Sequence, residues 1–460
     1  MFIRTGGKTM AQNRLVLVAV LLTSFVVPFM GSAINLAIPA MGEEFNVNPA
    51  TLSWVVSIYI LGSVAILLPI GRWSDITGRK RTYTTGLVFM IIFTGLSAFA
   101  WSVESLILFR LGQGLASSML FSTGMTMIVS VYKPGERGKI IGYSAASTYI
   151  GLSLGPVLGG VITHCISWRG IFCFTVILLL LSLYTILKVK AEWYGAQGGR
   201  LDYIGSFCYM VAGVGVLYGC SNLAIGMWAW CCLAGGCVFF ALFIWQQLHS
   251  DIPLLDLKLF RENKVFAMSN LAAMINYSAT FAIGFSLSLY LQLVRGFDAP
   301  SAGLVLLIQP CLMALFSPKA GALSDRIEPR LVASLGMTLN TIGLIAFAFL
   351  DANTPIWQIG IAFAIIGLGF ALFSSPNNNA IMGAVEPPLY GIAASVLAFM
   401  RLMGQAMSMA IVTLILSIYA AASVQDTYNE VLLMAINCTF AVFAGLCAAG
   451  ILASLARGKS

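Results

Sequence analysis

Two arginines lie inside long apolar stretches of the sequence, where a permanent charge is costly. Arg110 is followed by Gln113 and Gly114, three and four residues later, so the three share one face of a helix. A guanidinium stays protonated at any working pH, and placing it at the centre of a bilayer costs at least about 3 kcal/mol. We therefore expect Arg110 to serve in one of two ways. It orients a substrate or relays a proton in a wet cavity, or it is a structural charge that bonds backbone carbonyls.

Arg401 repeats this arrangement later in the chain. Gly404, Gln405 and Ser408 follow it at spacings of three, four and seven residues, on the same face of a helix. Two interpretations again stay open. Arg401 attracts an anionic substrate, or it holds its helix in place as an interface charge.

Uncharged amides form a third group of candidates. Asn35, Asn276 and Asn377 each lie in an apolar stretch of the chain. An amide at membrane depth can contact a polar substrate, or it can bond to a neighbouring helix for about 1 kcal/mol. The sequence does not decide between these two roles.

Metal and covalent chemistry find little support in the sequence. The chain has two histidines and ten cysteines, without a C-x-x-C pair, so we expect neither a metal site nor a cofactor. There is no phosphate-binding glycine loop and no Ser/His/Asp set. An enzyme embedded in the membrane and acting on lipid would need acids or histidines near a membrane face. We therefore predict that the protein is not an enzyme, and keep a lipid enzyme and a non-transporting sensor as remote alternatives.

The composition indicates an integral membrane protein. Of 460 residues, 59% are hydrophobic and 9% are charged, whereas a soluble domain carries about 25% charged residues. The net charge of +8 comes mainly from Lys and Arg between the apolar segments. Such a bias reports membrane orientation and not nucleic-acid binding.

The apolar segments predict about fourteen membrane helices and no strands. The first, starting at Leu15, is too long for a cleaved signal and is read as a retained helix. The expected helices lie near 15–40, 52–70, 82–101, 105–132, 139–163, 168–188, 203–222, 226–248, 264–294, 300–320, 331–350, 355–382, 389–420 and 431–455.

An internal repeat divides these helices into two sets. Gly71-x-x-Ser74-Asp75 recurs 250 residues later as Gly321-x-x-Ser324-Asp325. We predict a 6+2+6 arrangement, with a six-helix half at 1–190, two inserted helices and a linker at 191–263, and a second six-helix half at 264–460.

A charged turn follows the first copy of the repeat. Gly71, Asp75, Gly78 and Arg79 lie in an eleven-residue stretch with five charges, four of them basic, between two apolar runs. Hydrocarbon does not accommodate such a stretch, so we expect a tight turn at the cytoplasmic face. Its spacing resembles the loop between helices 2 and 3 of the major facilitator superfamily.

A second pattern supports this resemblance. Glycines and a proline recur through the predicted helix 139–163, where glycines four apart leave a stripe on which another helix can pack closely. The residues of this pattern are Gly151, Gly155, Pro156, Gly159 and Gly160. It is similar to the antiporter motif of the superfamily, and the 6+2+6 count resembles the fourteen-helix drug:proton antiporter branch.

The resemblance implies a fold, a function and several residue roles. The implied protein is an all-α polytopic transporter of the major facilitator fold, a monomer in the cell membrane with both termini cytoplasmic. It would export small amphipathic or organic ionic compounds by alternating access, in contact with lipid and with protons as candidate coupling ions. Asp75 and Arg79 would stabilise the outward-facing state by bridging the two halves. Asp325 and Arg326 would do so more weakly.

The sequence departs from this branch at a position that bears on how transport is coupled to protons. Asn35 and Pro39 match the end of a helix-1 motif whose aspartate is replaced here by Met30. All 17 acidic residues fall in loops or at the ends of predicted helices, although proton-coupled transporters commonly use acids inside the membrane. An exporter or exchanger of organic anions or metabolites that is not coupled to protons is therefore the main alternative. Protons could otherwise be carried at a membrane face by Asp75, Asp202 or His164.

Overall fold

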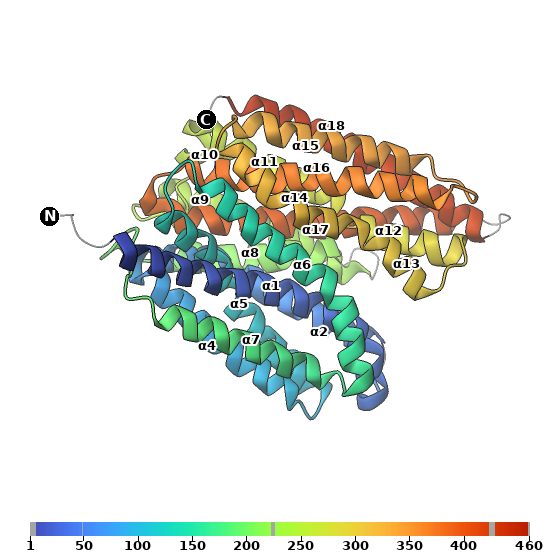
Figure 1. The fold of residues 1–460 in the computed structure, drawn as a ribbon, viewed down its shortest axis with the longest axis horizontal. Coiled ribbons are helices and arrows are strands. Elements are labelled where there is room, and N and C mark those ends of the chain that lie inside the picture. Colours follow the sequence, from blue (N-terminus) through green and yellow to red (C-terminus); the bar gives the residue numbers. More distant parts are fainter. Residues whose placement is uncertain (1–5, 48, 222–225, 423–427, 459–460) are drawn as a thin grey trace.

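The computed structural model describes residues 6–47, 49–221, 226–422 and 428–458. Within these ranges the chain is helical and contains no β-strand, which confirms the predicted all-α class. A helix pairs its own backbone N–H and C=O groups, as hydrocarbon requires of any spanning segment. Figure 1 shows the long helices side by side, with both ends of the chain at the same end of the molecule.

The helices that precede residue 190 pack together, and we call them the first bundle. They are α1 (Gly6–Phe45), α2 (Pro49–Ala65), α3 (Leu67–Thr77), α4 (Arg79–Ala98), α5 (Val103–Val131), α6 (Arg137–Cys165) and α7 (Arg169–Leu187). Within the bundle α1 packs on α6 and α7, and α5 packs on α2 and α4.

The span formed by α2 and α3 is bent by 47°, where the sequence predicts a single helix near 52–70. Pro69 explains the break, because it has no N–H to donate to the carbonyl of Ala65, four residues earlier. A second correction concerns the charged turn. Gly71 and Asp75 belong to α3, and the chain turns at Gly78.

The helices that follow residue 263 form the second bundle. They are α11 (Lys264–Thr280), α12 (Ile283–Leu289), the π-helix η1 (Tyr290–Val294), α13 (Ala299–Leu306), α14 (Ile308–Ser324), α15 (Pro329–Ala348), α16 (Ile356–Gly383), the 3₁₀ turn η2 (Pro387–Leu389), α17 (Tyr390–Ala422) and α18 (Tyr428–Ala456).

Two predicted spans of this bundle are also interrupted, each for a local reason. Pro310 cannot donate to Leu306, so α13 ends there and α14 begins two residues later. Between α11 and α12, the N–H of Ala282 donates to Oγ of Ser408 on α17 at 3.0 Å instead of continuing the helix.

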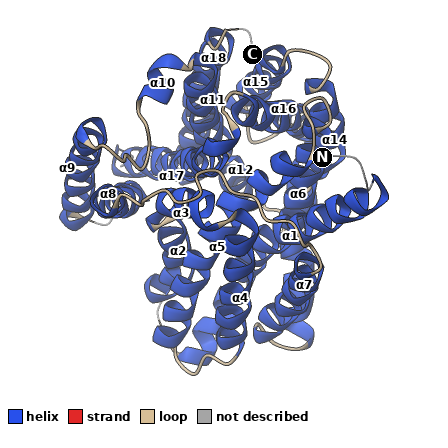
Figure 2. Ribbon diagram, turned by 90° about the vertical axis from the view of Figure 1, so that its left-hand side faces the viewer, coloured by secondary structure: helices blue, strands red, loops and turns tan. Residues whose placement is uncertain are grey.

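Three helices lie between the two bundles in sequence: α8 (Tyr203–Ser221), α9 (Met227–His249) and the short α10 (Lys258–Glu262). The first of them, α8, packs on α2, α3 and α17, whereas α9 packs on α8. Figure 2 shows α8 and α9 at the edge of the molecule, with α9 outermost. Asp202 holds the pair together, since its carboxylate accepts the N–H of Gly205 at 2.8 Å and the amide of Gln247 at 2.8 Å.

By length and apolar composition, 12 of the described helices can cross a membrane, and the bent pair α2–α3 gives a thirteenth. The remaining predicted span corresponds to α4, which starts with three basic residues and therefore has a shorter apolar part. It packs on α5 and α7 as a member of the first bundle.

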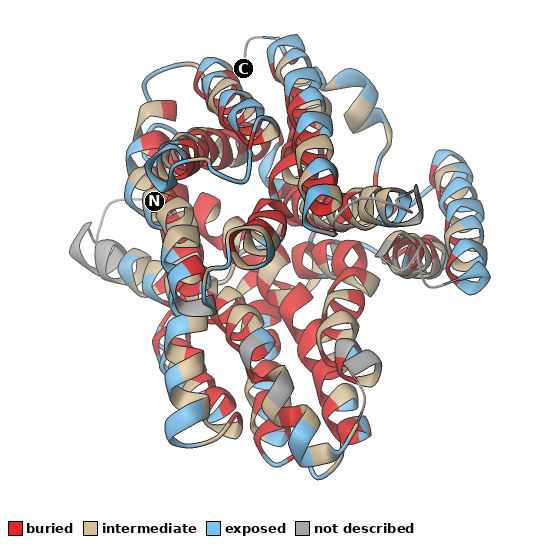
Figure 3. Cartoon of the chain, turned by 90° about the vertical axis from the view of Figure 1, so that its right-hand side faces the viewer, coloured by how far each residue is buried: buried red, intermediate tan, exposed pale blue. Residues whose placement is uncertain are grey.

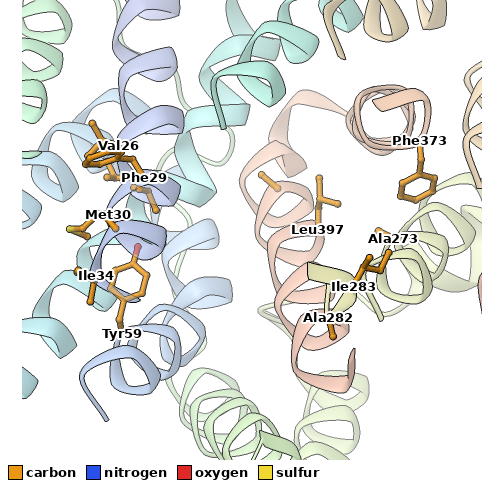
Figure 4. Close-up of a cluster of buried hydrophobic side chains, with 14 of the residues drawn as sticks. Val26, Phe29, Met30, Ile34, Tyr59, Ala273, Ala282, Ile283, Phe373 and Leu397 are labelled. Atoms are coloured by element: carbon orange, nitrogen blue, oxygen red, sulfur yellow. The ribbon is translucent and has the colours of Figure 1, made fainter. Parts of the chain in front are cut away.

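Buried side chains of both bundles form one large apolar core. Figure 3 shows that buried positions face inward and exposed ones outward. Many exposed side chains are large and apolar, such as Ile177 on α7 and Trp228 on α9, as expected of surfaces that face hydrocarbon. In Figure 4 the side chains of α1 and α2, such as Met30 and Tyr59, lie across from those of the second bundle, such as Leu397.

The glycine stripe of α6 sets how closely this helix approaches α1. A Cβ atom added at Gly155 would lie 2.6 Å from Cβ of Ser32, and one added at Gly159 would lie 2.6 Å from Cβ of Ala33. At Gly151 it would clash with the carbonyl oxygen of Phe25. The helix continues through Pro156, and Gly160 is partly exposed. The stripe is therefore a packing surface between two helices of one bundle.

We predict that Gly155→Ala lowers the thermal stability of the purified protein, since overpacking a close contact costs about 1–3 kcal/mol. Gly31→Ala on α1 is the matched control, because nothing lies within 4 Å of a Cβ at that position. It should be neutral or slightly stabilising, since alanine favours a helix over glycine by roughly 0.5–1 kcal/mol. Equal melting temperatures for the two variants would contradict this account.

Candidate functional site

Asp75 and Arg79 form a buried ion pair at the turn between α3 and α4. Asp75 is fully buried and Arg79 is 2% exposed. Oδ1 of Asp75 accepts hydrogen bonds from Nε of Arg79 at 2.9 Å and from Nη2 at 2.8 Å. The turn depends on Gly78, whose φ of +113° disfavours any residue with a Cβ.

This ion pair also joins the two bundles. The N–H of Gly391, at the start of α17, donates to Oδ2 of Asp75 at 3.0 Å. Arg79 donates to the carbonyl of Pro387, and its guanidinium lies 5.3 Å from the ring centroid of Tyr390. Gly71 permits this approach, because a Cβ there would lie 2.7 Å from the carbonyl oxygen of Gly391.

Asp325 makes the corresponding contact in the opposite direction. From the end of α14 its carboxylate accepts the N–H of Gly138 at 2.9 Å and that of Lys139 at 3.0 Å, both in the first turn of α6. A carboxylate at a helix N-terminus pairs N–H groups that have no partner inside the helix and meets the positive end of the helix dipole. Arg326 is exposed and lies outside this contact.

These hydrogen bonds lie at the end of the molecule where α3, α14 and η2 meet the starts of α6 and α17. At the opposite end, no hydrogen bond joins the two bundles in the part of the chain that the structure describes. There Arg169 bonds Glu44 and the carbonyl of Ala100 within the first bundle, and Arg295 bonds Ala352 within the second. Figure 1 shows the two bundles diverging toward that end.

Aromatic residues of both bundles meet in the middle of the molecule. The ring of Tyr149 on α6 lies 5.9 Å from that of Phe370 on α16, which lies 5.3 Å from that of Tyr277 on α11. The guanidinium of Arg401 lies 5.3 Å from the ring centroid of Phe121 on α5. We call these five residues the midplane cluster.

Arg401 forms no ion pair with an acid in the described part of the chain. The ion pairs among the described residues are Asp75–Arg79, Glu44–Arg169 and Glu328–Arg330. The guanidinium of Arg401 instead lies against the ring of Phe121. It lies eleven residues into α17, about 17 Å along the helix, and it is partly exposed, as is Gln405 one turn later.

Arg110 lies inside the first bundle, 1% exposed. Its Nε donates to the carbonyl of Val55 at 2.9 Å, its Nη1 donates to Gln113 at 2.7 Å, and its guanidinium lies 4.4 Å from the ring centroid of Tyr59. Gln113 in turn donates to Thr94 and Ser97 on α4. These partners match the structural interpretation of Arg110.

Tyr59 is a partner of Arg110 that the sequence analysis missed. The guanidinium of Arg110 lies over its ring. A tyrosine in an apolar helix carries no sequence signal of this kind.

The amide candidates separate into two kinds. Asn276 accepts a hydrogen bond from Asn340 at 3.0 Å, and Asn377 accepts one from Arg457 at 2.9 Å. Both are fully buried and bond between helices. Asn35 is exposed on the same face of α1 as Gly31, next to open space.

Arg457 is the second residue that the sequence analysis missed. It is 1% exposed and donates to Ser269 at 3.1 Å as well as to Asn377, so it ties α18 to α11 and α16. It lies beyond the last predicted helix, near 431–455.

We predict that Arg110→Ala lowers the thermal stability strongly, by about 2 kcal/mol or more. The substitution leaves Oε1 of Gln113 without its donor in an apolar interior, at about 1–3 kcal/mol, and removes the packing of the guanidinium on Tyr59. Arg401→Ala is the matched control, since Arg401 is partly exposed and the described structure gives it a ring contact without a hydrogen bond. Thermal unfolding in detergent measures both, and an equal loss in the control would argue against this assignment.

Known proteins resemble this chain in sequence and in fold. The model of the Major Facilitator Superfamily matches residues 20–407 and 269–459. Riboflavin transporter RibZ of Clostridioides difficile is 29% identical over 92% of this chain and 91% of that protein. Multidrug resistance protein Stp of Mycobacterium tuberculosis is 26% identical over 89% of this chain and 77% of that protein. The crystal structure of the human organic anion transporter MFSD10 (TETRAN) has a TM-score of 0.66 at 11% identity and covers 98% of this chain and 100% of that one. The chain therefore belongs to the Major Facilitator Superfamily of membrane transporters.

Proposed function

We propose that this transporter exports small amphipathic organic compounds, including organic ions, by alternating access. The observation that carries the proposal is the set of hydrogen bonds between the bundles at one end, made by Asp75, Arg79 and Asp325. The opposite end has no such bonds among the described residues. We call the bonded end the gate. Opening it while the other end closes would expose the midplane cluster to the other side of the membrane.

The orientation follows from charge. We assign the gate to the cytoplasmic side of the cell membrane, because Lys80, Arg81 and Arg137 lie there. Both chain ends lie at the same end in Figure 1, so they are also assigned to the cytoplasm. The structure then corresponds to the outward-facing state.

The organisation proposed from sequence is kept. Residues 1–190 and 264–460 are the two moving halves, and residues 191–263 carry the inserted helices. We assign the chain, as a monomer without enzymatic activity, to the fourteen-helix antiporter branch. The glycine stripe of α6 and the multidrug resistance relative support this assignment.

The residues of the midplane cluster are suited to binding planar substrates. The rings of Tyr149, Tyr277 and Phe370 offer apolar faces, which stack with aromatic compounds. The names of two relatives, a riboflavin transporter and a multidrug resistance protein, agree with compounds of this kind.

A second candidate function, export or exchange of organic anions without protons, is favoured by Arg401. Among the residues that the structure describes, this charge has no acidic partner, and it would attract an anion. Met30, which replaces the aspartate of the branch, is fully buried and carries no proton. An inside-negative membrane potential would drive anion exit with about 2.3 kcal/mol per charge at 100 mV.

Efflux from proteoliposomes, with the membrane potential and the pH gradient set independently, tests both candidates. The probes are fluorescein as an anion, ethidium as a cation and riboflavin as a neutral planar compound. We expect efflux of at least one probe. We further expect Arg401→Ala to slow fluorescein efflux about tenfold or more, as loss of one charged contact of about 1.4 kcal/mol or more predicts, while Gln405→Ala has a smaller effect.

Two outcomes would overturn these assignments. If no probe moves under any gradient, the export of amphipathic compounds is wrong. If ethidium efflux follows the pH gradient and survives Arg401→Ala, while fluorescein does not move, the anion route is wrong.

We also predict that Asp325→Asn slows turnover by roughly three- to tenfold and leaves KM within about twofold. The amide has one acceptor oxygen for two N–H donors, so about 1 kcal/mol of gate stability is lost. Initial transport rates over a range of substrate concentrations measure both quantities. Arg326→Ala is the control from the adjacent, exposed position and should be unchanged. An equal loss in the control, or full turnover in Asp325→Asn, would remove Asp325 from the gate.

A further inference from the structure

A segment without helix or strand crosses the gate between α7 and α8. It begins after Leu187 and ends before Tyr203. Figure 2, which looks at the gate end, shows this loop running from α8 past α3 toward α7. We call residues 189–199 the strap.

The strap binds the start of α4. The first N–H groups of a helix have no partners within it. Glu192 accepts two of them: Oε1 accepts the N–H of Lys80 at 2.8 Å and Oε2 accepts that of Arg81 at 3.0 Å. The carbonyl of Trp193 accepts the N–H of Arg79 at 2.9 Å. The carboxylate thus caps α4 from a distant part of the chain, at the positive end of the helix dipole.

The strap also binds the end of α3. The carbonyl of Asp75 accepts the N–H of Gly195 at 2.9 Å and that of Ala196 at 2.8 Å. Between the two helices, a Cβ added at Gly78 would lie 2.7 Å from Cδ of Glu192. The strap therefore holds both sides of the turn that sets the distance between Asp75 and Arg79.

One residue of the strap reaches the second bundle. A Cβ added at Gly195 would lie 2.7 Å from Oδ1 of Asp75 and 2.6 Å from the carbonyl oxygen of Pro388. Gly195 therefore lies between the gate carboxylate and the loop of the second bundle that Arg79 contacts. Lys80 also donates to the carbonyl of Val189, which fixes the start of the strap.

We propose that the strap is a component of the gate and that Glu192 is a positioning residue for it. By capping α4, Glu192 fixes the turn at Gly78 in the geometry that lets Asp75 reach Gly391 and Arg79 reach Pro387. The strap bonds the first bundle through five hydrogen bonds to the backbone of α3 and α4, and it contacts the second bundle at Pro388. It therefore stays with the first bundle when the gate opens.

The inference rests on the movement of two bundles in the proposed function, but not on any substrate. It is tested by distances across the gate in the full-length protein, in lipid nanodiscs and without added substrate. Spin labels at Lys133 and Glu386, exposed positions on the first and second bundles, are introduced in a variant without the ten native cysteines. We expect Glu192→Ala to raise the long-distance population at least threefold, and Glu192→Asp to restore part of the short-distance population.

Two further variants separate positioning from general destabilisation. Glu262→Ala removes an exposed acid of α10 near the gate and should leave the distances unchanged. Glu192→Gln retains one acceptor oxygen and the size of the side chain, so it is used if Glu192→Ala does not fold. We expect it to shift the distances in the same direction with little change in melting temperature.

The proposal is overturned if Glu192→Gln keeps the native distances, or if it lowers the melting temperature without opening the gate. Failure of the transport assays would not bear on this result, because the distances need no substrate. An equal opening in Glu262→Ala would also reject the special role of Glu192.

Discussion

The arrangement of the two bundles depends on one kind of contact, a carboxylate on the N-terminus of a helix that belongs to the other bundle. Asp75 accepts the N–H of Gly391 at the start of α17, and Asp325 accepts those of Gly138 and Lys139 at the start of α6. A helix start has unpaired N–H groups and partial positive charge in any sequence, so the contact needs no matched side chain on the partner. It does need close approach. Glycines at 71, 138, 321 and 391 provide it, because each would place a Cβ against backbone or a carboxylate of the other bundle.

Arg110 and Arg401 both lie in apolar helices, but their charges are compensated to different extents. Arg110 has a carbonyl, an amide and the face of Tyr59 as partners, and these replace water for a buried guanidinium. Arg401 has the ring of Phe121 and keeps part of its surface exposed. A charged side chain with few partners inside a membrane span marks a candidate functional site. The difference between the two residues therefore favours Arg401 as the one that meets a substrate.

Much of this fold is predictable from the sequence, because hydrocarbon restricts a spanning chain to few solutions. The lengths of the apolar segments predict the helices. The repeat of Gly71 and Asp75 as Gly321 and Asp325 predicts the two six-helix halves. The breaks at Ala65 and Leu306 each follow from a proline four residues later in the chain. A proline inside an apolar run does not by itself say whether the helix bends or continues, as it does through Pro156. The site was harder to predict. Asn276 and Asn377 resemble substrate ligands in sequence, yet their partners, Asn340 and Arg457, come from helices that only the tertiary fold brings near.

The two halves of the repeat have diverged at the gate, and the strap explains why they could. In the first bundle Asp75 is fully buried, pairs with Arg79 and has its own carbonyl bonded by the strap. In the second, Asp325 is partly exposed and Arg326 is exposed outside this contact. The carboxylate of Asp325 accepts hydrogen bonds from Gly138, Lys139 and the amide of Asn379. A buried acid without a paired cation would destabilise the protein, whereas a partly hydrated acid can lack a cation. Only the turn that the strap covers therefore requires a complete ion pair. The segment that leads into the inserted helices thus has a physical reason to lie over the first copy of the motif and not over the second.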